Sequence, residues 1–105
     1  MAKRPYFQVV CVLGKRVVVT AEYWDKIIRF KHPILAGKED EVKQTLEHPD
    51  QIRQSKSDAA VKLYYRAYDS RHLCIVVKHT NGSGFIVTGY FTDKIKEGTN
   101  IWTKL

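Results

Sequence analysis

The sequence predicts an α+β fold in which an N-terminal hairpin and two helices pack on a twisted antiparallel β-sheet. Two runs of β-branched residues open the chain, and two segments with helical spacing follow them. From residue 51 onward, apolar and polar residues alternate with a period of two, which is typical of strands. A length of 105 residues suits one hydrophobic core, so we expect a single domain over residues 1–105.

The hairpin is expected at 6–13 and 15–20, where the runs YFQVVCVL and KRVVVT are separated by Gly14. Basic residues ahead of an apolar run superficially resemble a secretory signal. However, the run is short and gives way at once to Lys15 and Arg16. We therefore expect a first strand and a cytoplasmic protein.

Two helices are expected next. The first lies within AEYWDKIIRFKHP, can be capped by Thr20 and is ended by Pro33, because the residue before a proline avoids the helical region. The second lies within KEDEVKQTLEHPD, begins with a cluster of acids and ends at Pro49. Val42 and Leu46 are four residues apart and share its apolar face.

The sheet is expected from QIRQSK, VKLYYRAY, HLCIVVKHT and GFIVTGYFT, which short turn-prone segments join into an antiparallel meander. The tail KIKEGTNIWTKL is expected to cap the sheet edge. Alternation sorts the strands into two faces. The face toward the helices is predicted to hold Val61, Leu63, Tyr65, Ala67, Phe85, Val87, Gly89 and Phe91. The open face is predicted to hold Lys62, Tyr64, Arg66, Tyr68, Ile86, Thr88, Tyr90 and Thr92.

No metal, cofactor or membrane segment is expected. Cys11 and Cys74 lie in apolar runs, where a free thiol behaves as a small buried hydrophobe. The histidines lack the spacing of a metal site, and Asp58, Asp69 and Asp93 fall in predicted turns rather than forming a carboxylate pair. No apolar run is long enough to span a bilayer.

The net charge of +7 is unevenly distributed along the chain. Residues 1–20 carry four basic and no acidic groups, residues 21–50 carry five basic and seven acidic groups, and residues 51–105 carry nine basic and four acidic groups. The positive excess therefore lies in the strand regions. With aromatic rings and hydroxyls on the open face, this charge favours RNA as a partner, although a strand face that simply meets solvent has a similar pattern.

Metal-free RNA cleavage needs a base for the ribose 2′-hydroxyl, a cation for the phosphate and an acid for the leaving 5′-oxygen. His32 follows the first helix in KHP and is a candidate acid or base, but a histidine at a helix end can also simply favour the helix dipole. Arg66 and Lys78 are candidates for binding the phosphate, and Thr88 and Tyr90 are candidates for orienting it.

Three further residues complete the expected site. Tyr64 could stack a base or supply a proton, and Lys26 and Thr92 are expected to bind substrate. The acid and base roles stay open among His32, Lys26, Lys78 and the tyrosines, because burial decides their pKa values.

Five motifs follow one another over residues 23–102: YWDKIIRFKHP, TLEHPDQIRQSK, LYYRAY, LCIVVKH and GFIVTGYFTDKIKEGTNIW. In this order they resemble the small nuclease domains of the barnase–EndoU–colicin–RelE superfamily. The chain looks most like the phage- and cyanobacteria-type branch, and it is also similar to the BrnT toxins. It departs from the branch at Gly89, where alanine is expected, and the exchange looks harmless from the sequence.

The resemblance implies a RelE/barnase-like fold and ribonuclease activity without a metal, often as the toxin of a toxin–antitoxin pair. RNA and a cognate antitoxin protein are then the expected partners. On matching positions it implies His32 as the helix histidine, Arg66 as the strand arginine and Thr88 as the hydroxyl of the last strand. Tyr64 and Tyr90 stand beside these residues in the same motifs.

Two other functions stay open. The same face could bind nucleic acid without cutting it, as in a nuclease fold that has lost catalysis. Alternatively, it could dock an acidic or amphipathic protein partner, which an antitoxin would also be.

Overall fold

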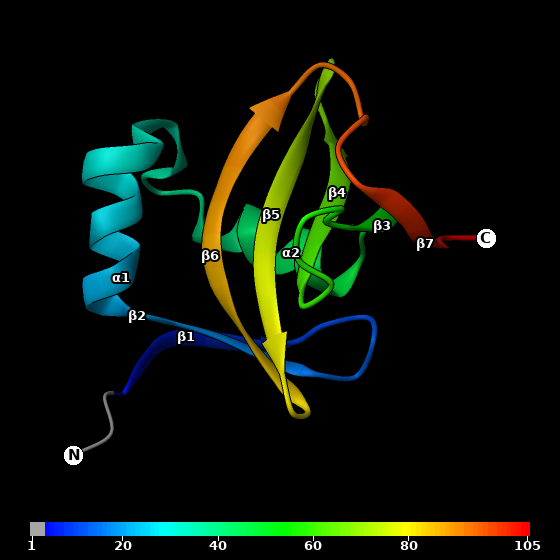
Figure 1. Cartoon of the computed structure of the whole chain (residues 1–105). Coiled ribbons are helices and arrows are strands. Elements are labelled where there is room, and N and C mark those ends of the chain that lie inside the picture. Colours follow the sequence, from blue (N-terminus) through cyan, green and yellow to red (C-terminus); the bar gives the residue numbers. More distant parts are fainter. Residues whose placement is uncertain (1–3) are drawn as a thin grey trace.

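A seven-stranded sheet organises residues 4–105, the part of the chain that the computed structural model describes (Figure 1). Its strands lie in the order β1-β2-β6-β5-β4-β3-β7. They are β1 (Pro5–Val10), β2 (Arg16–Thr20), β3 (Gln51–Gln54), β4 (Val61–Tyr68), β5 (Arg71–Thr80), β6 (Ser83–Thr92) and β7 (Thr99–Thr103). The α+β class is confirmed.

The sheet is mixed, because the N-terminal hairpin belongs to it instead of packing on it. Residues Arg16–Val18 of β2 pair in parallel with Ser83–Phe85 of β6, whereas the other strand pairs within residues 4–105 are antiparallel. The C-terminal tail also joins the sheet. It forms the edge strand β7 against β3, where the sequence predicted only a cap.

The helices lie between the hairpin and the meander, as predicted. They are α1 (Ala21–Lys26), a π-helical turn η1 (Ile27–Lys31), a 3₁₀ turn η2 (Pro33–Leu35) and α2 (Glu39–Glu47). Thr20 caps α1, since its Oγ1 accepts a hydrogen bond from the Tyr23 backbone N–H at 3.2 Å. Figure 1 shows α2 behind the sheet and α1 beside β6.

The two faces of β4 are the reverse of the prediction. Tyr64 pairs with Ile75 and lies with it in the core beneath the helices, and Arg66 shares that face. Leu63 and Tyr65 lie on the open face instead. Alternation shows which residues share a face, but both faces of β4 contain apolar and aromatic side chains, so the pattern alone did not decide which face the helices cover.

A β-bulge changes the phase of β6. Val87 has no partner on β5, because the register shifts between Ile86 and Thr88. Ahead of the bulge, Ile86 is buried in the helix-side core and Phe85 is exposed, which is the reverse of the prediction. Beyond the bulge, the predicted open face is kept by Thr88, Tyr90 and Thr92.

β2 covers only the first part of the β6 edge, because it pairs only with Ser83–Phe85. The turns η1 and η2 also contact β6. Cys11 and Cys74 are buried and unpaired, as predicted. Within residues 4–105, no helix is both long and apolar enough to cross a membrane.

Candidate active site

Two side chains that can carry chemistry, Lys31 and His32, reach β6 where η1 passes its edge, near Val87 and Tyr90. The His32 and Tyr90 rings have centroids 6.1 Å apart and planes tilted by 38°. The ammonium of Lys31 lies 3.3 Å from the backbone oxygen of Val87. Thr88 lies between Val87 and Tyr90 along β6, and its side chain is on the same face of the strand as that of Tyr90.

The backbone around His32 brings its ring to the sheet. His32 has an extended conformation (φ −141°, ψ 82°), as expected for the residue before Pro33, and therefore leaves the helix direction. Leu35 then packs against β6 at Gly89, where an added Cβ would lie 3.2 Å from Leu35 Cδ1 and 2.9 Å from Ile75 Cδ1. Gly89 thus permits the close approach of the segment after His32 to β6, and an alanine at this position would require the end of the Ile75 side chain to shift.

Lys31 is a site residue that the sequence did not single out. Its ammonium lies 3.2 Å from the Tyr23 hydroxyl and 5.3 Å from the centroid of that ring. The Tyr23 hydroxyl in turn donates to the Val87 oxygen at 2.9 Å. Both side chains therefore contact a carbonyl on the part of the β6 edge that β2 does not pair, and the π-helical turn between them left no regular spacing by which the sequence could have paired them.

A layer of tyrosine and cysteine side chains supports Tyr90 on the open face. Tyr65, Cys74 and Tyr90 are cross-strand neighbours on β4, β5 and β6. Burial raises the pKa of Tyr65 to about 12 and that of Cys74 to about 12. Burial, with the adjacent Cys74, also raises the pKa of Tyr90 well above its ordinary value. Tyr90 therefore stays protonated near neutral pH and can donate a hydrogen bond, while Cys74 stays a thiol and is a poor nucleophile.

The hydroxyl of Thr88 lies in the floor of the site. Its Oγ1 is shielded from solvent and has no hydrogen-bond partner among residues 4–105. A shielded hydroxyl without a partner reduces stability, typically by about 1–3 kcal/mol. Polar atoms of Glu41, Tyr65, His72 and His79 are in the same state, so this feature does not by itself identify a functional site.

Tyr64 lies on the opposite face from this group. It is fully buried, and its hydroxyl lies 2.9 Å from His79 Nε2 and 3.2 Å from Cys11 Sγ. Burial, with the hydrogen bond to Cys11, raises the pKa of Tyr64 far above its ordinary value. The predicted roles of stacking a base or supplying a proton require access to solvent, which Tyr64 lacks.

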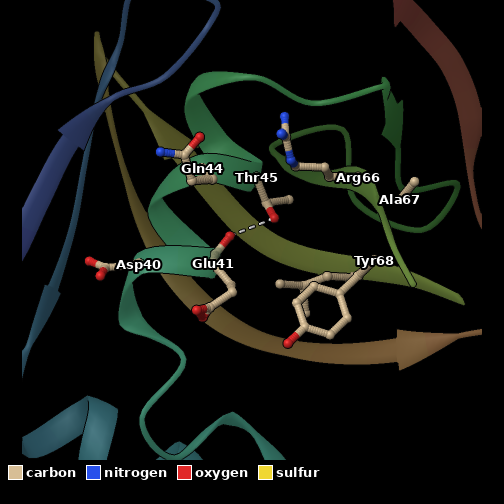
Figure 2. Close-up of a pocket in the computed structure, with 8 residues that line it drawn as sticks. Asp40, Glu41, Gln44, Thr45, Arg66, Ala67 and Tyr68 are labelled. Atoms are coloured by element: carbon tan, nitrogen blue, oxygen red, sulfur yellow. Dashed lines mark hydrogen bonds between the residues drawn. The ribbon is translucent and has the colours of Figure 1, made fainter.

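Arg66 also lies on the helix-side face, away from His32. Its guanidinium donates to the backbone oxygen of His48. Arg66 lines a pocket of about 170 Å³ together with Asp40 and Glu41 of α2, and Figure 2 shows these side chains on the helix and the facing strand. Two carboxylates make this pocket unfavourable for a phosphate, so the predicted convergence of Arg66 with Thr88 on one face is wrong.

The three predicted substrate-binding residues lie apart from one another. Lys78 is on the open face and pairs with Asp58 at 3.3 Å. Thr92 Oγ1 donates to the backbone oxygen of Lys94 at 3.0 Å and stabilises a turn. Lys26 is exposed in the last turn of α1.

In residues 4–105, no three His, Cys, Asp or Glu side chains are grouped so that they could hold a metal ion. The chain matches no protein-family model, no curated protein and no solved structure. The geometry at the β6 edge is therefore the basis for the functional argument.

Proposed function

We propose that this protein is a metal-independent endoribonuclease whose active site is the group Lys31, His32, Thr88 and Tyr90. The observation that carries the proposal is the His32 ring against Tyr90, with the Lys31 ammonium at the carbonyl of Val87, three residues earlier on β6. An imidazole, a cation and a protonated phenol are the three kinds of group that metal-free cleavage of RNA needs.

The proposed reaction begins when His32 takes the proton from a ribose 2′-hydroxyl. The 2′-oxygen attacks the adjacent phosphorus, and the bond from phosphorus to the 5′-oxygen breaks. Lys31 stabilises the negative charge that develops on the phosphate oxygens, and Tyr90 donates a hydrogen bond or a proton to the departing oxygen. The products are a 2′,3′-cyclic phosphate and a free 5′-hydroxyl, so no atom or electron is gained from outside.

The motif order described above supports a more specific version of this proposal. It favours a RelE/barnase-like arrangement of helices and sheet, and the role of a toxin that a cognate antitoxin restrains. The two free, buried cysteines fit a reducing compartment such as the cytoplasm.

The test is to incubate the purified protein with RNA in excess EDTA and to identify the product ends. His32→Ala is expected to lower the cleavage rate by about a hundredfold or more, because a positioned acid or base contributes that much. His48→Ala is the matched control, since His48 also follows a helix and precedes a proline. Intact RNA with the wild type, or equal loss in both variants, would contradict the proposal.

A second candidate is a module that binds RNA without cutting it, because the shielded hydroxyl of Thr88 is not placed to orient a phosphate. A substrate reaches Oγ1 only if neighbouring side chains move. This candidate predicts affinity for RNA that falls with salt, and no product after long incubation.

A further inference from the structure

A hollow opens beside the candidate active site where β2 and β6 separate. The two strands pair only as far as Val18 and Phe85, after which β2 runs into α1 and β6 continues along the sheet (Figure 1). The hollow measures about 210 Å³. It is lined by Val18, Val19, Thr20, Tyr23, Phe85 and Ile86.

The β-bulge at Val87 creates the exposed wall of this hollow. It turns Phe85 out of the core, so that 41% of this residue is exposed, and it turns Ile86 inward. A large aromatic side chain in the middle of a strand pattern is normally expected in the core. Here it is presented at the surface, two residues from the carbonyl that Lys31 and Tyr23 contact.

The polar groups of the lining are already engaged. Thr20 Oγ1 accepts a hydrogen bond from the Tyr23 backbone N–H, and the Tyr23 hydroxyl donates to the Val87 oxygen. The remaining lining side chains are apolar. A ligand in the hollow therefore gains contact with an aromatic ring and with aliphatic groups, but finds few hydrogen-bonding groups by which it could be discriminated.

Size and charge narrow the class of ligand. Pockets for drug-sized molecules are roughly 300–1,000 Å³, so a hollow of about 210 Å³ suits a single planar ring. The Lys31 ammonium lies 3.2 Å from the hydroxyl of Tyr23, which lines the hollow, so a cation lies at its rim. A flat ring with a π-face, attached to a negative charge, fits both features, and a nucleotide has this chemistry when the polar edge of its base stays in solvent.

We infer that the hollow binds one nucleobase of an RNA strand, stacked on Phe85, next to the phosphate that Lys31 holds. The inference rests on the proposed function and adds a subsite to it. Base stacking on an aromatic side chain tolerates any base, because every base has a π-face. This subsite therefore strengthens binding without selecting a sequence.

The test is fluorescence anisotropy with a labelled RNA oligonucleotide that carries 2′-O-methyl groups and so cannot be cleaved by 2′-hydroxyl attack. Phe85→Ala is expected to weaken binding roughly tenfold, and to do so alike for oligonucleotides of uridine, cytidine or adenosine. Phe85→Leu keeps an apolar side chain but lacks the ring, and is expected to lose most of the same affinity. Ile101→Ala is the matched control, because Ile101 is 44% exposed on β7 at the other side of the sheet and should leave affinity unchanged.

A second arm uses oligonucleotides in which one nucleotide at a time is abasic. The wild type is expected to bind weakly when the abasic position falls in the hollow, and Phe85→Ala should be insensitive to that position. Equal affinity of Phe85→Ala and wild type, or an equal abasic effect in both, would overturn the inference. So would loss of a protein partner in Phe85→Ala with unchanged RNA affinity.

These outcomes are independent of cleavage. If the wild type cuts RNA and Phe85→Ala binds normally, the subsite is wrong and the ribonuclease stands. If the effect of an abasic position is lost in Phe85→Ala but the wild type cuts no RNA, the subsite is supported and the proposed ribonuclease activity is wrong. Thermal unfolding of each variant checks that the fold is intact.

Discussion

Both faces of the sheet carry a tyrosine near a histidine, but the two tyrosines differ in burial and in the groups that they contact. On the helix-side face, Tyr64 is fully buried and its hydroxyl contacts His79 and Cys11. On the open face, Tyr90 is partly exposed and its ring lies against His32. The difference shows that residue type does not identify a site, because a tyrosine can be part of a core or part of a surface according to the phase of its strand.

The cations on the two sides differ in the same way. Arg66 donates to a backbone oxygen and lines a pocket with two carboxylates. Lys31 contacts a backbone oxygen and a tyrosine hydroxyl, both of which are neutral. A phosphate would therefore meet less opposing charge at Lys31 than at Arg66.

The comparison is tested most strongly by truncating the two tyrosines. Tyr64→Ala is expected to lower the free energy of unfolding by about 3–5 kcal/mol, because it removes a fully buried aromatic side chain. Tyr90→Ala should cost less stability but most of the cleavage activity. Urea unfolding and the EDTA cleavage assay together separate the two effects, and equal stability losses would show that the faces do not differ as described.

Replacing each of the two cations with glutamine is expected to give the next largest effect. Lys31→Gln is expected to reduce the cleavage rate by about a hundredfold, since it removes a donor to the developing charge. Arg66→Gln should leave cleavage close to the wild-type rate and lower stability slightly. Lys56→Gln, in an exposed loop, is the control for simple loss of charge. A larger effect on cleavage from Arg66→Gln than from Lys31→Gln would restore the assignment that the sequence favoured.

The helices and strands could be predicted from the sequence, because the spacing of apolar residues and the turn residues are local signals. The helix that ends before Pro33 and the strands within VKLYYRAY and GFIVTGYFT lie where they were expected. The sequence could not predict that the N-terminal hairpin joins the sheet. This arrangement depends on a parallel pairing between β2 and β6, which are more than sixty residues apart, and no local pattern encodes that contact.

The candidate site was accessible only in part, for reasons that lie in particular residues. His32, Thr88 and Tyr90 were predicted and lie together on the open side of β6. Arg66 was misplaced because alternation leaves the phase of β4 undetermined. Phe85 was misplaced because the one-residue bulge at Val87 inverts the pattern ahead of it.

Lowering the pH is expected to destabilise the protein through His79, which lies on the helix-side face of the sheet. Burial, with the nearby charges of Lys62 and Lys15, lowers the pKa of His79 to about 4 from the usual 6.5. The unfolded chain thus takes up the proton near pH 6.5, and the folded protein does so only near pH 4. The free energy of unfolding should therefore fall by roughly 2–3 kcal/mol as pH decreases through this window, because His79 is buried.

Urea unfolding at a series of pH values measures this loss, and His79→Gln should remove most of it. His72→Gln is the control, because His72 lies on the same strand but on the open face. A pH dependence that is unchanged in His79→Gln would place the titrating group elsewhere.

The smallest predicted effect concerns Thr88, where stability and activity should change in opposite directions. Thr88→Val replaces a shielded hydroxyl that has no partner in the described chain with a methyl group, so the free energy of unfolding is expected to rise by about 1 kcal/mol. If that hydroxyl serves the substrate, cleavage falls in the same variant. Thr92→Val removes a hydroxyl that is hydrogen-bonded within a turn and should lower the free energy of unfolding, so here stability and activity are not expected to change in opposite directions. A Thr88→Val variant that is both less stable and fully active would show that the hydroxyl is structural and has no role with the substrate.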